Sequence, residues 1–312
     1  MIDFVGRRKW YFIASAAVIL VGVIALGVLG LNWGIEFTSG SVMTLDFEQP
    51  VTGEQLRGAL ATLGHEEAIV QGAEGDTFMV RTAKLAEDAV DPTTGEHMSE
   101  EEWLRRGLEE SFGPVEIVSS YDVSPSLARD IVNYASYAVA LAAVGILVYI
   151  TWAFRRLVRP FRFGVTAIIA LVHDVLIVLG CSALLGMEVD AMFITAILTV
   201  VGYSVNDTIV VFDRIRENAA RASSQPLEFI VNSSIMEVMG RSLNTSLSTL
   251  FVLLALFLFG GATIHNFVLV LIIGVVVGTY SSIFVASQLL VVWERNDVGR
   301  LFRRVIPRRA SA

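Results

Sequence analysis

Charged residues are scarce in this chain. Asp, Glu, Lys and Arg together make up only 17% of its 312 residues, whereas 54% are hydrophobic and the mean hydropathy is positive. These values are typical of a protein that crosses a membrane several times and argue against a soluble enzyme. Cysteine is nearly absent as well, since Cys181 is the only one. A disulfide within the chain is therefore excluded, and cysteine usage leaves the redox compartment open.

Several chemical motifs are also missing. The chain contains no Walker A run, no HExxH pair and no CxxC pair, so nothing in the sequence points to ATP or to a metal. The Tyr-Asp and Gly-x-Gly-Asp motifs of intramembrane aspartyl proteases are absent from its apolar runs, where the aspartates follow His173 and Asn206 instead. The sequence therefore predicts a protein that is not an enzyme, with no catalytic residue, no cofactor and no metal site.

Long apolar runs are what the chain has in abundance. A helix crosses the hydrocarbon core of a bilayer with about 20 residues. The first run follows Arg7, Arg8 and Lys9, but its 22 residues are too many for the apolar part of a signal peptide and no A-x-A site follows, so we expect a retained helix. Six spans are predicted, at 10–31, 131–154, 163–185, 191–212, 242–260 and 267–293.

Basic residues are missing from two of the connections between spans, and this sets the orientation. Residues 186–190 and 261–266 contain no Lys or Arg, whereas the connections at 155–162 and 214–221 and the stretch 295–309 are rich in Arg. The positive-inside rule then places both termini in the cytoplasm, which an even number of spans allows. The predicted organisation is an N-terminus with span one (1–31), an outer domain (32–130), spans two to six (131–293) and a basic cytoplasmic tail (294–312).

The outer domain is predicted to fold on its own. It carries 20 acidic and only 6 basic residues, which either keep an exposed domain soluble or attract a basic partner. Residue patterns predict strands at 34–47, 67–71, 77–82 and 115–120, helices at 52–63 and 99–113, and a turn at 91–95. The resulting order, βαββαβ, is that of a ferredoxin-like α+β domain, so the fold class is a six-helix membrane bundle with one extracytoplasmic domain.

Two further patterns concern the membrane part. Residues 214–241 have apolar residues at helical spacing, so we expect this connection to lie along the membrane surface. Span six contains Gly274-x-x-x-Gly278, a spacing that lets helices approach closely. A lone six-helix unit is expected to leave this small-residue face and the polar faces described next against lipid, which predicts a membrane partner.

Ionisable side chains inside the apolar runs are costly, so each needs a partner or a function. Span three has His173 and Asp174 near its centre. Two polar faces follow at helical spacing: Tyr203, Asn206 and Asp207 in span four, and Arg241, Asn244, Thr245 and Ser248 in span five. Because span four runs inward and span five outward, Asp207 and Arg241 are predicted to lie at similar depth, where they can meet.

Two interpretations fit these residues. In the first, Asp207, Arg241 and Asp174 form a proton path, in which an aspartate exchanges a bound proton for an ion pair with arginine. In the second, a static buried ion pair and its polar neighbours lock the helices together. Taken alone, His173 fits the structural interpretation better. A passive scaffold would need no buried charge.

Four sequence runs resemble the SecF family, the smaller membrane subunit of the bacterial SecDF export complex, within the resistance-nodulation-division (RND) superfamily. They are GYSVNDTIVVFDRIREN at 202–218, VHD at 172–174, RSLNTSLST at 241–249 and FGG at 259–261. The resemblance covers the whole chain. The chain departs from the family at FTSG (37–40), where FTGG is usual, because serine lacks the freedom of glycine at positive φ. Residues 91–99 resemble a family-variable insertion.

The resemblance implies a function in the bacterial plasma membrane. It implies pairing with SecD as two similar six-span halves, and action beside the SecYEG channel and a YidC-type insertase on a translocating preprotein. The proton motive force would drive movements of the outer domains, with Asp207 as proton site, Arg241 as its basic partner and Asp174 nearby. The expected coupling ion is H⁺, with Na⁺ left open. The alternative is a half-transporter of the same superfamily for a small molecule or lipid, which would usually carry a second large outer loop.

Overall fold

The structure, a computed structural model, describes residues 2–72, 76–90, 97–155, 157, 159–222 and 224–295. It contains two compact units. One comprises Met1–Asn32 and Tyr137–Ala312, and the other Trp33–Ser136. The predicted turn at 91–95 lies outside the described residues, as does the predicted basic tail from residue 296 onward.

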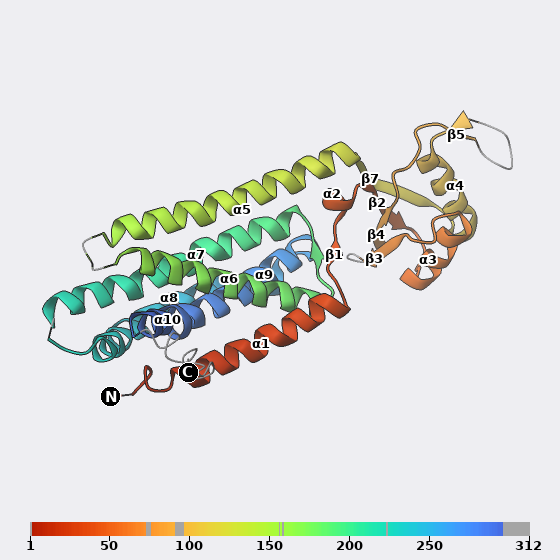
Figure 1. Cartoon of the computed structure of the whole chain (residues 1–312). Helices are drawn as coiled ribbons and strands as arrows, with labels where there is room; N and C mark the ends of the chain where they lie inside the picture. Colours follow the sequence, from red (N-terminus) through yellow and green to blue (C-terminus); the bar gives the residue numbers. More distant parts are fainter. Residues whose placement is uncertain are drawn as a thin grey trace, which may run out of the picture. The chain divides into compact units, whose positions relative to one another are not determined.

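The first unit is a bundle of long helices that lie along one another (Figure 1). Within the described residues, six are long and apolar enough to cross a membrane. They are α1 (Arg8–Val28), α5 (Pro125–Ala153), α6 (Phe161–Leu184), α7 (Ala191–Arg221), α8 (Leu227–Phe259) and a sixth made of α9 (Ala262–Ser281), the π-helical turn η1 (Ser282–Ala286) and α10 (Ser287–Glu294). A short strand, β8 (Glu188–Val189), lies between α6 and α7.

Burial separates inner from outer helices. In α6 and in the sixth span, 56% of the most apolar window is buried, whereas none of it is buried in α5 and only 17% in α1 and α8. The described residues of α6, α7 and α9 therefore form the centre of the bundle, and polar side chains on their facing surfaces are removed from lipid.

The segment predicted to lie on the membrane surface is instead part of two long helices. α7 continues past the predicted end of its span to Arg221, and α8 begins at Leu227 and runs without a break to Phe259. Ile230, Val231 and Ile235 are buried in the bundle. The prediction of a separate surface helix was wrong because the apolar spacing of 214–241 serves packing between helices.

The glycine pair of α9 packs within the bundle. A Cβ added to Gly274 would lie 2.1 Å from Val200 Cγ2, and one added to Gly278 would lie 3.0 Å from Ser204 Cβ. Both neighbours are on α7, so α7 and α9 approach as closely as small residues permit. The expectation that this face would be left against lipid was therefore wrong, and the glycine pair gives no support for a membrane partner.

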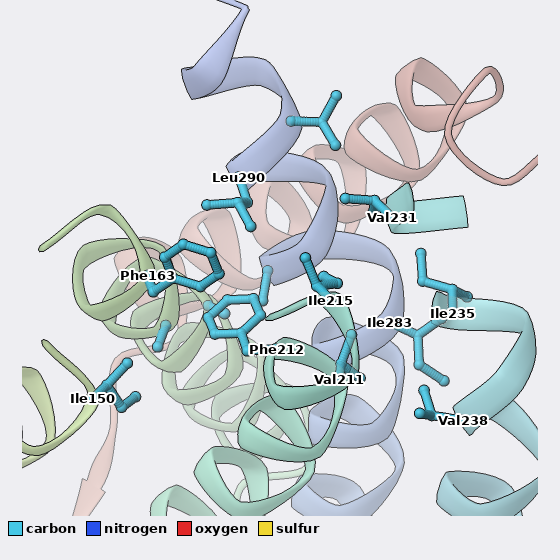
Figure 2. Close-up of a cluster of buried hydrophobic side chains, with 14 of the residues drawn as sticks. Ile150, Phe163, Val211, Phe212, Ile215, Val231, Ile235, Val238, Ile283 and Leu290 are labelled. Carbon is cyan, nitrogen blue, oxygen red and sulfur yellow. The ribbon is translucent and has the colours of Figure 1, made fainter. Parts of the chain in front are cut away.

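A cluster of buried apolar side chains fills one end of the bundle. Figure 2 shows Phe163 of α6 and Phe212 and Ile215 of α7 pointing into the same space as Leu290 of α10. The rings of Phe163 and Phe212 meet edge to face, with centroids 5.2 Å apart, a favoured aromatic geometry. This cluster fixes α7 and α10 against each other next to the polar groups described below.

The second unit contains a four-stranded sheet. Its strands are β2 (Gly40–Phe47), β3 (Ile69–Gly72), β4 (Thr77–Thr82) and β7 (Val115–Val123), and its sheet order is β3-β4-β2-β7 with all neighbours antiparallel. The main helices are α3 (Gly53–Thr62) and α4 (Glu100–Phe112). Shorter elements are β1 (Asn32–Trp33), α2 (Ile35–Thr38), β5 (Ala89–Val90) and β6 (His97–Met98). The predicted helices and strands are present, except that the first strand begins at Gly40 and the start of its predicted range, Ile35–Thr38, is the helix α2.

Local sequence signals account for the two main helices of this unit. Thr52 and Gln55 form a capping box at the start of α3, and Ser99 caps α4 by accepting a hydrogen bond from the Glu102 backbone N–H. Apolar side chains of both helices, among them Leu56, Leu60, Leu104 and Leu108, are fully buried with Leu45 and Val80 of the sheet. Burial of these side chains is the main source of the unit's stability.

The FTSG departure lies in a strained turn. Ser39 adopts φ 66° and ψ 160°, and Gly40 follows with φ 142°. The conformation of Ser39 belongs to a region that is populated almost entirely by glycine, and a serine there costs about 1–3 kcal/mol. A Cβ at Gly40 would lie 2.4 Å from the Thr82 carbonyl oxygen, so the second glycine is needed for close approach of the chain to β4.

Candidate proton site

Asp207 is held between α7 and α8. It lies on α7 with only 8% of its surface exposed. Its Oδ1 accepts a hydrogen bond of 2.6 Å from the Ser242 hydroxyl of α8. Its Oδ2 is buried and has no hydrogen-bond partner among the described residues. A buried carboxylate oxygen without a donor is costly when the group is ionised, and the cost is smaller when that oxygen carries a proton, because the group is then neutral.

The predicted contact between Asp207 and Arg241 is not formed. Arg241 is exposed and lines a hollow of about 430 Å³ together with three carboxylates, those of Asp213, Glu217 and Glu237. Arg241 comes one residue before Ser242 on α8 and also faces α7, but it does so at the open hollow, whereas Ser242 occupies the buried contact with Asp207. The shorter side chain fits the buried position.

Hydrogen bonds between hydroxyl groups join the helices near Asp207. The Tyr203 hydroxyl donates to Ser246 Oγ of α8 at 3.0 Å, and Ser246 in turn lies 2.6 Å from Thr279 Oγ1 of α9. Thr208, the residue after Asp207, lies 3.0 Å from Ser282 Oγ at the start of η1. These bonds join α7, α8 and α9 around the carboxylate, and they need no lipid-exposed polar atom.

Asp174 is at the centre of a second cluster. It is 1% exposed, and both of its oxygens have partners. His173 Nδ1 lies 2.9 Å from Oδ1, while the hydroxyls of Ser204 and Ser281 donate to Oδ2 at 2.6 and 2.7 Å. The His173 ring also stacks on Tyr280, 6.4 Å between centroids. This cluster joins α6, α7 and α9.

The other predicted polar residues lie on the outside of the helix bundle. Asn206 is exposed on α7, and Asn244, Thr245 and Ser248 are exposed on α8. The Thr245 and Ser248 hydroxyls donate to carbonyl oxygens of their own helix. Of the predicted residues in spans four and five, only Asp207 and Tyr203 therefore make side-chain bonds between helices.

Several residues of the two clusters were missed by sequence reasoning. They are Ser204, Thr208, Ser242, Ser246, Thr279, Ser281 and Ser282. Two spacings carried a signal: Ser242 and Ser246 are one helical turn apart, and Ser282 continues the four-residue spacing of Gly274 and Gly278. The π-helical turn that begins at Ser282 had no visible signal, although such turns are frequent at functional sites.

No group of three or more His, Cys, Asp or Glu side chains within the described ranges could hold a metal ion. The chemistry offered by these clusters is that of carboxylates, one imidazole and hydroxyls, which bind and pass protons. The expected absence of cofactors stays a prediction.

Comparisons with known proteins identify the family. The family model described as "Protein export membrane protein SecD/SecF, C-terminal" matches residues 103–296, and the "SecD/SecF GG Motif" model matches residues 24–51, which include Ser39 and Gly40. A protein translocase subunit SecF from Thermobaculum terrenum is 46% identical over 317 residues, covering 100% of both chains. The chain belongs to the SecF family. Another SecF relative, from Petrotoga mobilis, is 42% identical over 93% of this chain and 95% of its own length.

Solved structures agree with the SecF assignment. A crystal structure of SecDF from Thermus thermophilus, described as a translocon-associated membrane protein, matches with a TM-score of 0.82 and 34% identity over 94% of this chain. SecDF in a super-membrane-facing form matches with a TM-score of 0.65 over 97% of this chain. The chain spans 39% and 40% of these SecDF chains. As a SecF-family member with six spanning helices among its described residues, it is a multi-pass membrane protein and a subunit of the protein translocase.

Proposed function

We propose that this SecF-family chain is one half of a proton-driven machine for protein export, and that Asp207 takes up and releases the coupling proton. One observation carries the proposal: the carboxylate is buried, one oxygen is fixed by Ser242, and the other has no partner among the described residues. A group of this kind keeps its position while its free oxygen gains or loses a proton. Arg241 is proposed to act from the hollow beside α7 and α8, rather than as a fixed partner of Asp207.

The energy available to such a site is adequate. A proton that crosses a membrane potential of 100 mV releases about 2.3 kcal/mol. A difference of this size between the protonated and ionised states shifts a two-state equilibrium by roughly fifty-fold. The proton on Asp207 can therefore select between two arrangements of α7 and α8, and the outer domain is the part on which such a movement would act.

A SecD-type partner is proposed from the exposed polar face of α7 and α8. Asn206 and Arg241 are exposed, and each adjoins a residue of the buried pair Asp207 and Ser242. Asn244, Thr245 and Ser248 extend this face along α8. Polar groups facing lipid are costly, so a second six-span half is expected to cover them. The shared SecD/SecF family model and the SecDF neighbours support this partner.

The remaining assignments follow from the family and the charge pattern. We propose a plasma-membrane location with both termini in the cytoplasm, and an outer, ferredoxin-like domain formed by Trp33–Ser136. The proposed further partners are the SecYEG channel, a YidC-type insertase and the translocating preprotein. No enzymatic activity is proposed.

The test uses vesicles that contain the translocase with this chain and its SecD-type partner. Asp207→Asn keeps the size of the side chain and can still accept from Ser242, but it cannot titrate. Its complex should assemble normally and lose the part of preprotein export that depends on an imposed proton gradient. Asp130→Asn is the control because Asp130 is an exposed carboxylate on α5 that does not line the hollow of Arg241, and it should behave as wild type.

Wild-type gradient-dependent export by a well-assembled Asp207→Asn complex would refute the proton-site proposal. Repeating the assay with a Na⁺ gradient at constant pH separates the two possible coupling ions, since only H⁺ coupling predicts no response there.

A further inference from the structure

Residues 2–6, which precede α1, are tied to the start of α8 by one buried amide. The amide belongs to Asn232 of α8, which is only 7% exposed. Its Oδ1 accepts hydrogen bonds from the backbone N–H groups of Phe4 at 2.8 Å and Val5 at 3.3 Å, and its Nδ2 donates to the Ile2 carbonyl oxygen at 2.9 Å. Residues 2–6 therefore form a strap across the start of α8.

The strap also packs against the π-helical turn η1. Phe4 and Val5 are buried in the apolar cluster that contains Val231 of α8 and Ile283 of η1, both labelled in Figure 2. The ring of Phe4 lies 5.8 Å from the ring of Phe284, another residue of η1, between centroids. The hydrogen bonds fix the path of the strap and the ring contact fixes its depth. The strap therefore joins the start of α8 to η1.

The two elements that the strap joins both face α7 at the level of Asp207. From α8, Ser242 donates to Oδ1 of Asp207. η1 begins at Ser282, whose hydroxyl lies 3.0 Å from that of Thr208, the residue after Asp207. A change in the arrangement of these helices around the carboxylate must therefore either carry the strap along or break its bonds.

The strap leads directly into α1, whose start is itself attached to the sixth span. The ring of Tyr11 on α1 lies 4.6 Å from the ring of Phe284, between centroids, and the Tyr280 hydroxyl donates to the Tyr11 carbonyl oxygen at 3.0 Å. Beyond the other end of α1 the chain enters the second unit, which begins at Trp33. A displacement of α8 or η1 can therefore reach α1 through the strap and these contacts.

We propose that the strap couples the proton site to α1, because it makes the start of α8, η1 and the start of α1 move as one body when the proton on Asp207 changes. The inference rests on the proposed proton role of Asp207. Packing of apolar side chains explains the burial of Phe4 and Val5, but it does not require an amide on a distant helix that satisfies three backbone groups of the strap. These hydrogen bonds break if the strap and α8 separate, so they oppose separate movement of the two.

The test uses vesicles that contain the translocase with this chain and its SecD-type partner. Asn232→Leu keeps the approximate size of the side chain and removes its hydrogen bonds to the strap. Three quantities are measured: hydrogen exchange at residues 2–6, the carboxylic acid infrared band of Asp207 after a step in pH, and preprotein export with and without a proton gradient. Asp207→Asn identifies the band by its loss.

The expected result in Asn232→Leu is a loosened strap beside an intact proton site. The backbone N–H groups of Phe4 and Val5 should exchange faster, while the Asp207 band and the export without a gradient stay at wild-type level. The additional export that the gradient produces should fall at least about fivefold, which is the size of a modest coupling between two sites. A purely structural role predicts instead that the band, both kinds of export and the assembled fraction fall together, and that result would overturn the proposal.

Two further variants make the result specific. Phe4→Ala removes the ring that contacts Phe284 and keeps the backbone groups that Asn232 binds. It should reduce the gradient-dependent export by a smaller factor, and it gives the same test should Asn232→Leu fail to assemble. Asp3→Asn is the control within the strap, because Asp3 is exposed and its Oδ1 accepts from the Gly6 N–H, which an amide oxygen also does. It should behave as wild type.

The outcomes distinguish the two proposals. If no band is lost in Asp207→Asn, the proton role of Asp207 is wrong. If the band is present and Asn232→Leu frees the strap while gradient-dependent export stays at wild-type level, the coupling role is overturned and the proton site stands. Unchanged exchange at residues 2–6 in Asn232→Leu would also overturn the coupling role, since Asn232 would then not hold the strap.

Discussion

Asp174 and Asp207 are both buried carboxylates on inner helices of one bundle, yet their surroundings differ. Asp174 has three hydrogen-bond partners on its two oxygens, from His173, Ser204 and Ser281. Asp207 has one, Ser242, and its Oδ2 has none among the described residues. The partners of Asp174 lie on the inner helices α6, α7 and α9, whereas that of Asp207 lies on the outer helix α8, beside the hollow that Arg241 lines.

The difference separates a group that holds helices from a group that can exchange a proton. Removal of a carboxylate with three partners breaks three hydrogen bonds at once, so such a group resists any change of state. Protonation of a carboxylate with one unbonded oxygen need not break a hydrogen bond. We therefore infer that Asp174 holds α6, α7 and α9 together and that Asp207 is the group whose protonation state changes. That Asp174 belongs to the proton path is a prediction from sequence that stays untested, and we do not include Asp174 in the proposed proton site.

The largest effect is expected from Asp174→Ala. It leaves two hydroxyls and an imidazole without their acceptor, which should lower the free energy of unfolding by about 3 kcal/mol. Asp207→Ala removes one bonded oxygen and should cost roughly 1 kcal/mol. Thermal unfolding of both variants in the same detergent measures the difference, and equal losses would abolish the distinction between the two sites.

A smaller effect is expected from Gly278→Ala. The added Cβ would lie 3.0 Å from the Ser204 Cβ and 3.3 Å from its Oγ, so it must displace the side chain that donates to Asp174. We expect a loss of about 1–2 kcal/mol in unfolding free energy. Gradient-dependent export by the surviving complex should remain. Selective loss of that export with unchanged stability would instead link Ser204 to the proton site.

Ser242→Ala should have the smallest effect on stability, about 1 kcal/mol or less, because a single hydrogen bond between spans is lost. Its effect on function should be clear, since the hydrogen bond that fixes Oδ1 of Asp207 in its ionised form is lost. We expect the pH profile of export to move while Ser248→Ala, on the exposed face of the same helix, leaves it unchanged. An unmoved profile would show that Ser242 does not act on Asp207.

Strong periodic signals made much of the fold predictable from sequence. The six spans and the main strands and helices of the second unit follow from apolar runs, alternation and caps such as Thr52 and Ser99. The long start of α8 was missed because the apolar spacing of 214–241 also fits a helix on the membrane surface. This stretch contains Glu228 and Glu237. In the structure they pair with Arg295 and Arg214, so charges of neighbouring segments compensate one another.

The site was predictable only in part. A lone Asp207 in an apolar run is conspicuous, but the rotation of α8 is not, since Arg241 and Ser242 are both polar and adjacent. The packing of α8 against α7 determines which of the two side chains is buried. The partners of Asp174 come from three helices, α6, α7 and α9, and no local pattern encodes such a meeting.

The most direct test compares Asp207→Asn with Asp174→Asn in the same complex with a SecD-type partner. Export of a preprotein is measured in vesicles with and without a proton gradient, and thermal stability is measured on the same preparations. The account predicts a stable Asp207→Asn complex without any gradient-dependent export, and a destabilised Asp174→Asn complex whose assembled fraction still responds to the gradient. A stable Asp174→Asn complex that has lost the response, or an Asp207→Asn complex that keeps it, would contradict the account.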